Sequence, residues 1–265
     1  MALPFLLLSS PAVLSQQQES DIYLEEVIVT AQKREQSLQD VPLAVSAFSA
    51  SDISNAEIRD IRSLQILSPS VNVTRSATSY QTSLSIRGIG TSGFNPGLEP
   101  SVGVFVDGVY RSRTGSAIGD FNELDRIEIL RGPQSTLYGK NSSAGVIGYY
   151  TKKPEYEFNG QAELSLGNYS QKIASARITG PLISDTLAFS LSGHYNERDG
   201  FIKNPAQNSD TNNRDRWGLR GQLLWDAGDS VQVRFIVDKT EHEEDCCAAP
   251  AFINGPTTPV IAALG

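Results

Sequence analysis

Cysteine and histidine are the residue types here that could support metal or redox chemistry, and their spacing favours neither. Cys246 and Cys247 are adjacent, whereas His194 and His242 stand in separate segments. A zinc site needs ligand pairs at characteristic spacings, which are missing. In an oxidising compartment the two cysteines form a strained vicinal disulfide or bond elsewhere. There is also no recognisable Ser/His/Asp motif or phosphate loop, so we expect no enzyme activity and no cofactor.

Arg131 is the charged residue whose position most needs an explanation. In the predicted strand that contains it, Ile127 and Ile129 share its face, while Glu128 and Leu130 lie on the other. A guanidinium on an apolar strand face is costly unless it reaches water or a carboxylate. The spacing alone leaves both solutions open.

The composition limits the class of protein. The chain has 265 residues, 39% of them hydrophobic, which is enough for one or two folded domains. Its net charge of −8 argues against a nucleic-acid partner. No apolar run approaches the roughly 18 residues that a membrane helix needs. A transmembrane strand needs only about 10 residues of alternating character, so a membrane protein built from strands remains open.

The N-terminal part contains two distinct segments. Residues 1–18 combine a short apolar core with small residues and glutamines, which is typical of the second half of a signal peptide, although a basic start is missing. The alternative is a disordered apolar tail. Residues 25–31 are extended and β-branched, and a segment of this kind with free backbone groups can add as a strand to a partner's sheet. The alternative is an internal edge strand of the following domain.

Residues 36–154 are predicted to form one compact α+β domain. Ser51 and Asp52 offer caps for a helix that carries Ile53, Ile58 and Ile61. A second short helix is expected over residues 61–67. Asp107-Gly108 is a strong signal for a hairpin turn. The expected strands, flanking this turn and elsewhere, cover residues 41–48, 71–74, 84–87, 102–106, 109–110 and 125–131.

Beyond Pro154 the pattern changes to long alternating strands, although the alternation is less clean over residues 171–180. Connections between these strands are alternately short and long, as in an outer-membrane barrel. A soluble β-sandwich shows the same alternation, so the pattern itself does not separate the two. The expected strands cover residues 161–166, 171–180, 187–195, 217–225 and 231–238.

Four ordered stretches resemble the family of TonB-dependent outer-membrane receptors. The strongest is Leu-Arg-Gly-Pro-Gln-Ser-Thr-Leu-Tyr-Gly at residues 130–139, and the others lie at residues 25–31, 86–90 and 104–110. Residues 144–150 depart from the usual last plug strand. The resemblance implies an α+β plug domain at 36–154, a TonB box at 25–31, and antiparallel transmembrane strands at 156–265. The barrel would then be incomplete, and we expect the sequence to be a partial receptor.

The same resemblance implies a function and a location. Family members sit in the outer membrane of Gram-negative bacteria, in contact with its lipid. They take up a scarce ligand, most often a ferric siderophore, with energy delivered through TonB. The alternative is a β-rich surface or periplasmic binding module without energy coupling.

The site residues follow from these assignments. The resemblance implies that the TonB box consists of Glu26, Val27, Ile28, Val29 and Thr30. We expect outward-facing plug apices to contact the ligand through aromatic and cationic side chains, with Phe94, Asn95, Tyr110, Arg111 and Arg113 as candidates. Arginines at the positions of Arg87 and Arg131 pair with barrel glutamates in the family and lock the plug in place. Here we expect both to look under-paired or to use a local acid such as Glu128; the alternative is that they pair wholly within the plug.

Overall fold

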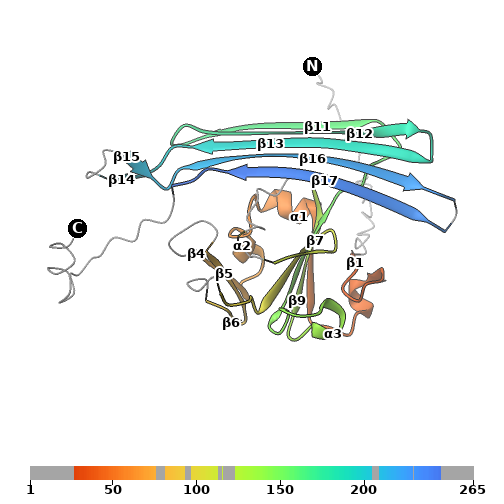
Figure 1. Cartoon of the computed structure of the whole chain (residues 1–265), viewed down its shortest axis with the longest axis horizontal. Coiled ribbons are helices and arrows are strands. Elements are labelled where there is room, and N and C mark those ends of the chain that lie inside the picture. The colour runs from red at the N-terminus through yellow and green to blue at the C-terminus, as the bar shows by residue number, and fades with distance from the viewer. Residues whose placement is uncertain are drawn as a thin grey trace, which may run out of the picture.

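The computed structural model in Figure 1 shows a large curved sheet lying across a smaller domain that mixes strands and short helices. The structure describes residues 27–75, 81–92, 97–112, 115, 123–204, 209–228 and 230–245. Several predictions therefore concern residues outside this part, namely the signal-like segment 1–18, Glu26, Phe94, Asn95, Arg113, Cys246 and Cys247.

A mixed five-stranded sheet forms the centre of the N-terminal domain. Only the β10–β7 pair is parallel; the other neighbours are antiparallel. In spatial order its strands are β3 (Val45–Ser49), β9 (Leu124–Arg131), β10 (Gly145–Thr151), β7 (Val102–Val106) and β8 (Val109–Arg111).

Smaller elements cover this sheet. A three-stranded sheet contains β4 (Val71–Arg75), β5 (Thr82–Ile86) and β6 (Ile89–Gly90), and a ladder joins β1 (Ile28–Val29) to β2 (Gln36–Ser37). The helices are η1 (Leu38–Asp40), α1 (Ala50–Asn55), α2 (Leu64–Leu67) and α3 (Ser135–Tyr138). Among the residues described, none of the helices is long and apolar enough to cross a membrane.

Helix α1 is shorter than the sequence pattern predicted. Ser49, rather than Ser51, is its N-cap, and Ser49 and Asp52 form a reciprocal capping box. The helix ends because Glu57 adopts φ 49°. Ile58 N then bonds to Ile53 O at 2.9 Å, and Glu57 N bonds to Ser54 O, which is a Schellman motif. Ile53 and Ile58 are nevertheless both buried. The apolar spacing therefore predicted the burial of these side chains correctly, but it predicted too long a helix.

Two apolar clusters lie on opposite faces of the central sheet. One contains Ile127 and Ile129 and packs against helices α1 and α2, whereas the other contains Leu130 and the buried Val29. The alternation expected for strand β9 is therefore confirmed. The Asp107-Gly108 hairpin between β7 and β8 is also confirmed: its two residues have φ of 48° and 80°, as a type I′ turn requires.

The large sheet, called the wall below, is fully antiparallel. Neighbouring strands of the wall follow one another along the chain, except that the β14–β15 hairpin (Ile202–Asn204 and Ser209–Thr211) comes between β13 and β16 in the sequence. This hairpin lies at one end of the wall in Figure 1. Short connections after β12 and β16 lie at the other end. All five strands are longer than predicted: β11 (Asn159–Gly167), β12 (Gln171–Ile183), β13 (Leu187–Arg198), β16 (Arg214–Asp226) and β17 (Gln232–His242).

The wall has the opposite polarity to a sheet in a soluble protein. Its polar face packs on the N-terminal domain, and Ser192, for example, is only 5% exposed. Its apolar face is turned outward, and neighbouring Leu191 is 52% exposed. A soluble sandwich would bury the apolar face instead. Apolar-out and polar-in alternation is the pattern of a transmembrane barrel and resolves the ambiguity of the sequence. Other outward apolar residues are Leu164, Leu166, Leu219, Trp225, Val233, Phe235 and Val237.

A charge on the outer face of the wall should therefore destabilise the protein in a bilayer. We expect Leu191→Arg, near the middle of β13, to cost about 2–4 kcal/mol because the guanidinium would enter hydrocarbon. Reversible urea unfolding of the full-length gene product in lipid vesicles measures this. Asn168→Arg, in the exposed turn after β11, is the control and should change little. A negligible cost for Leu191→Arg would mean that this face meets water.

Candidate functional site

The segment predicted as the TonB box is packed into the N-terminal domain. Val29 and Ala31 are fully buried, and strand β1 pairs with β2. The backbone N of Thr30 donates to Glu128 Oε1 at 2.8 Å. The expectation of a free segment ahead of the folded domain is thus wrong for residues 27–31, because burial of these apolar side chains favours a docked position. Whether TonB binds the segment stays a prediction.

Glu128 is the centre of the contacts that hold this segment. Its carboxylate is fully buried, and it accepts from Arg126 Nε at 2.9 Å, while Arg126 Nη2 donates to Thr30 Oγ1. Burial lowers the pKa of Arg126, but the hydrogen bond and charge of Glu128 outweigh it and raise that pKa. Tyr138 adds a bond from its hydroxyl to Ala31 O at 3.2 Å. Burial raises the pKa of the Tyr138 phenol, which keeps it a donor. We call these five residues the box latch.

Arg131 is satisfied by hydroxyl groups rather than by an acid. It donates to Ser70 Oγ at 2.9 Å and to Ser46 Oγ at 2.8 Å. Within the described residues, neither Arg131 nor the exposed Arg87 forms an ion pair. Burial and the charge of Arg87 lower the pKa of Arg131. The suggestion that Glu128 pairs with them is wrong, because Glu128 lies on the opposite face of β9. Their role as a lock against the barrel stays a prediction.

Tyr110 and Arg111 do not converge on one surface. The hydroxyl of Tyr110 accepts from Asn141 Nδ2 at 2.7 Å, and its ring lies 5.4 Å from that of Phe105. Arg111 instead approaches Asp238 of the wall at 3.8 Å. Consecutive strand residues point to opposite faces, which separates the two side chains. Arg111 thus already has a carboxylate partner, and ligand binding by either residue stays a prediction.

Asp107 joins the N-terminal domain to the wall, which the sequence did not indicate. Its carboxylate accepts from the backbone N of Thr151 at 2.9 Å and pairs with Arg220 and, at 3.4 Å, with Arg234. Arg234 also donates to Gln222 Oε1 at 2.6 Å and Thr151 Oγ1 at 2.7 Å. We call these five residues the Asp107 junction. Its charges are largely removed from water, because the Asp107 side chain is 5% exposed.

Asp60 forms a second contact with the wall, close to the β14–β15 end. It pairs with Arg62 of its own loop at 3.2 Å and with Arg214 of β16 at 3.4 Å, and Arg216 is 4.0 Å away. Burial alone would raise the pKa of Asp60. The surrounding arginines, with a backbone hydrogen bond from Ser63, overcome that effect and lower the pKa below its ordinary 3.8.

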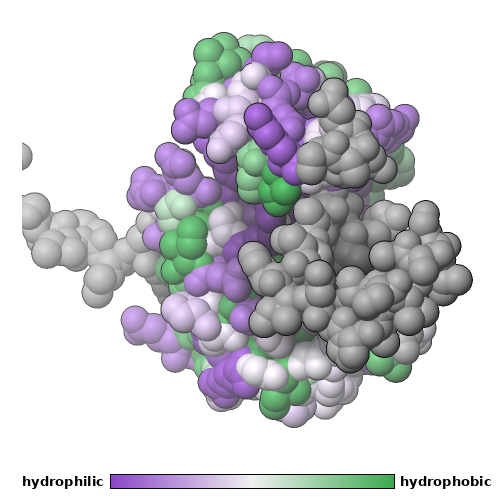
Figure 2. Space-filling model, turned by 90° about the vertical axis from the view of Figure 1, so that its left-hand side faces the viewer, coloured by the Kyte–Doolittle hydropathy of each residue, from purple (hydrophilic) through white to green (hydrophobic). Residues whose placement is uncertain are grey.

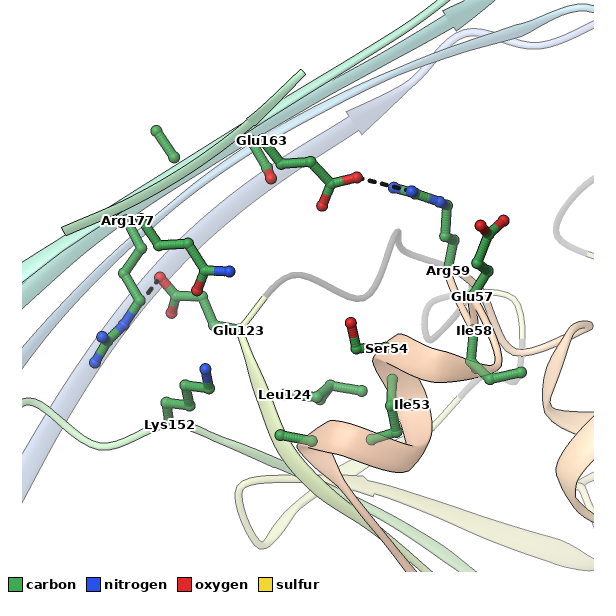
Figure 3. A pocket seen from close by; sticks show the side chains of 14 residues that line it. Ile53, Ser54, Glu57, Ile58, Arg59, Glu123, Leu124, Lys152, Glu163 and Arg177 are labelled. Atoms are coloured by element: carbon green, nitrogen blue, oxygen red, sulfur yellow. Dashed lines mark hydrogen bonds and ion pairs between the residues drawn. The ribbon is translucent and has the colours of Figure 1, made fainter. Parts of the chain in front are cut away.

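Helix α1 is less tightly joined to the wall. A polar cavity of about 370 Å³ separates α1 from strands β11 and β12, as Figure 3 shows. Arg59 and Glu163 form an ion pair across it at 2.7 Å, but both side chains are more than a third exposed. On the other side of the cavity, Arg177 lies 3.8 Å from Glu123. The exposed Arg59–Glu163 pair contributes little. The side chains of Arg177 and Glu123 are only 8% and 2% exposed, so this seam is held mainly at its Arg177 end.

Comparison with known proteins agrees with this architecture. The family model described as the TonB-dependent receptor plug domain matches residues 37–146. The pesticin receptor of Yersinia pestis is 30% identical over 74% of this chain and 28% of its own length. The iron-regulated outer membrane virulence protein of Vibrio cholerae is 31% identical over 66% of this chain and 28% of its own. The crystal structure of the ferric yersiniabactin uptake receptor FyuA from Yersinia pestis superposes with a TM-score of 0.68 at 25% identity, over 75% of this chain and 31% of that one.

The N-terminal domain is a plug, and the wall is a set of antiparallel barrel strands. The chain belongs to the TonB-dependent receptors, which are outer-membrane proteins and not enzymes. It spans less than a third of the length of the relatives described above.

Loss of the Asp107 carboxylate should loosen the plug. Asn has nearly the same shape and tolerates the positive φ of this turn, so Asp107→Asn preserves the hairpin. It leaves two arginines without their shared acid, which we expect to cost about 2–4 kcal/mol, slightly less than for a fully buried pair. Hydrogen exchange of strands β7 and β10 in the full-length gene product measures the loss. Lys140→Gln removes an exposed ion pair with Glu99 and serves as the control. Unchanged protection in Asp107→Asn would show that the junction contributes nothing.

Acid should weaken the Asp60 contact. Because the folded-state pKa of Asp60 is lowered, its stabilisation is complete above about pH 4 and is lost as the pH falls through that lowered value. The stability difference between wild type and Asp60→Asn should therefore be constant from pH 7 to about 5 and shrink toward pH 3. Denaturant unfolding across this range tests the sign. A difference that grows in acid would contradict the assignment.

Proposed function

We propose that this chain forms the plug and part of the barrel of a receptor that imports a ferric siderophore across the outer membrane with energy from TonB. The principal support is the plug itself, which is bound by buried ion pairs to the polar face of a wall whose other face is apolar. A plug fixed inside a barrel blocks free diffusion, so a bound ligand can pass only if the plug is disturbed, and that requires energy. The names of the relatives support iron as the cargo.

The docked box segment offers a route for that energy. Leu38 N donates to Val27 O at 2.9 Å, so Val27 and Leu38 form a hydrogen-bonded pair of the β1–β2 ladder. In an antiparallel ladder such pairs alternate, and the backbone groups of Ile28 therefore point away from β2. That outer edge, together with the 51% exposed side chain of Ile28, is available to an added strand from TonB. The bond from Thr30 N to Glu128 lies on the same edge and must break if the added strand extends to Thr30.

Proline at position 28 tests the coupling role. Ile28→Pro removes an outward N–H but no bond of the β1–β2 ladder, so the plug should fold while strand addition fails. In cells producing the full-length gene product, uptake of a radioactive ferric chelate should fall to the level of a strain without TonB. Binding of the chelate at the cell surface should persist. Ile28→Ala is the matched control and should retain uptake. Normal uptake by Ile28→Pro would reject the box assignment.

Deletion of TonB tests the function as a whole. An energy-coupled receptor supports growth on a ferric siderophore under iron limitation only when TonB is present. A β-rich binding module without energy coupling would show the same ligand binding and the same growth in both strains.

A further inference from the structure

Three arginines lie on one face of the wall, at the end that carries the β14–β15 hairpin. Arg198 of β13 stands directly opposite Arg214 of β16, and Arg216 follows two residues later on the same, plug-facing side. Like charges directly opposite each other on adjacent strands destabilise a sheet. Arg216 is also completely buried. Each of the three has a partner within the fold: Arg214 pairs with Asp60, Arg216 pairs with Glu244, and Arg198 Nη2 donates to Asn212 O at 2.7 Å. These partners do not balance the charge, because only two of them are acids.

The plug adds two more arginines at the same place. Arg62 comes from the loop before α2, and Arg75 ends strand β4. Two carboxylates are ion-paired with these groups: Asp60, already described, and Glu244, which pairs with Arg216 and, at 3.0 Å, with Arg75. We call the five arginines the arginine cluster; they are Arg62, Arg75, Arg198, Arg214 and Arg216.

The cluster concentrates positive charge in an acidic protein. Five guanidinium groups meet two paired carboxylates, in a chain whose net charge is −8. Burial lowers the pKa of Arg75, and the charge of Arg62 lowers it further, so the groups repel one another. The Nε atoms of Arg75 and Arg198 are buried donors without a hydrogen-bond partner within the described residues. Figure 2 looks onto this end of the molecule and shows hydrophilic side chains where the wall meets the plug.

We propose that the arginine cluster binds the carboxylate groups of an anionic ligand. Guanidinium groups present paired donors that match the two oxygens of a carboxylate, and unfilled donors gain the most from such a partner. A ligand with several carboxylates would offset the excess positive charge at the partly exposed side chains of Arg62, Arg75 and Arg214. This deepens the proposed function, on which it rests, by specifying a polycarboxylate chelate as cargo.

Citrate is a suitable probe, because it carries three carboxylates and no metal. Isothermal titration of the purified full-length gene product in detergent micelles, with ionic strength held constant by sodium chloride, should show saturable binding. Arg198→Gln should weaken it at least about tenfold, because charge-assisted hydrogen bonds are lost. Arg62→Gln, at a more exposed position, should also weaken it. Arg59→Gln removes an arginine outside the cluster, paired with Glu163, and should bind citrate as wild type does.

The outcomes separate the site from the transport function. Absence of saturable citrate binding to the wild type, or equal affinity in all four proteins, would overturn the site. Arg198→Gln should keep or raise the thermal midpoint, since it removes a like-charge pair; if it fails to fold, Arg62→Gln decides the question. Citrate binding that depends on the cluster, in a protein whose uptake does not need TonB, would uphold the site and reject the proposed function.

Discussion

The structure depends on one constraint, which is that a sheet with an apolar outer face must place its polar residues inside. There they are removed from water, and each buried charge then needs a partner. The plug supplies those partners: Asp107 for Arg220 and Arg234, and Asp60 for Arg214. Plug and wall are therefore not two independently stable domains that happen to touch. Each satisfies the buried charges of the other.

The sequence predicted the local features well because they depend on neighbouring residues. Alternation with a period of two clearly located four wall strands and less cleanly the fifth, β12, and the Asp-Gly pair at 107 located a type I′ turn. Four short motifs in the sequence also indicated the order of the domains. The length of helix α1 was overestimated, because nothing in the residue types shows that Glu57 leaves the helix with a positive φ.

The contacts between plug and wall could not be predicted from one sequence. Asp107 reaches arginines 113 and 127 residues further along the chain, and no local pattern records such a pairing. Asp107 was noticed only as a turn residue. Arg131 was noticed as a charge in need of water or an acid. Three serines are close enough to serve, and none of the described acids pairs with it. Residue type thus indicated that a partner was needed but not which chemistry would provide it.

The docked state of the box segment is only marginally favoured, which bears on how a partner could use it. Burial of Val29 and Ala31 contributes about 2–4 kcal/mol, and four hydrogen bonds to Glu128, Arg126 and Tyr138 contribute about 1 kcal/mol each. Ordering the five backbone units of residues 27–31 costs about 1–2 kcal/mol each, a sum of similar size. The two sides nearly cancel, so a small bias decides whether the segment is docked. A strand-adding partner needs to supply only the energy of a few backbone hydrogen bonds to compete with Glu128.

The buried ion pairs between plug and wall require more free energy to break than the contacts of the box segment, because removing a single partner already costs several kcal/mol. The chain therefore combines an easily released end with a firmly anchored body, and a pull on the end can be transmitted to the plug before the anchor gives way.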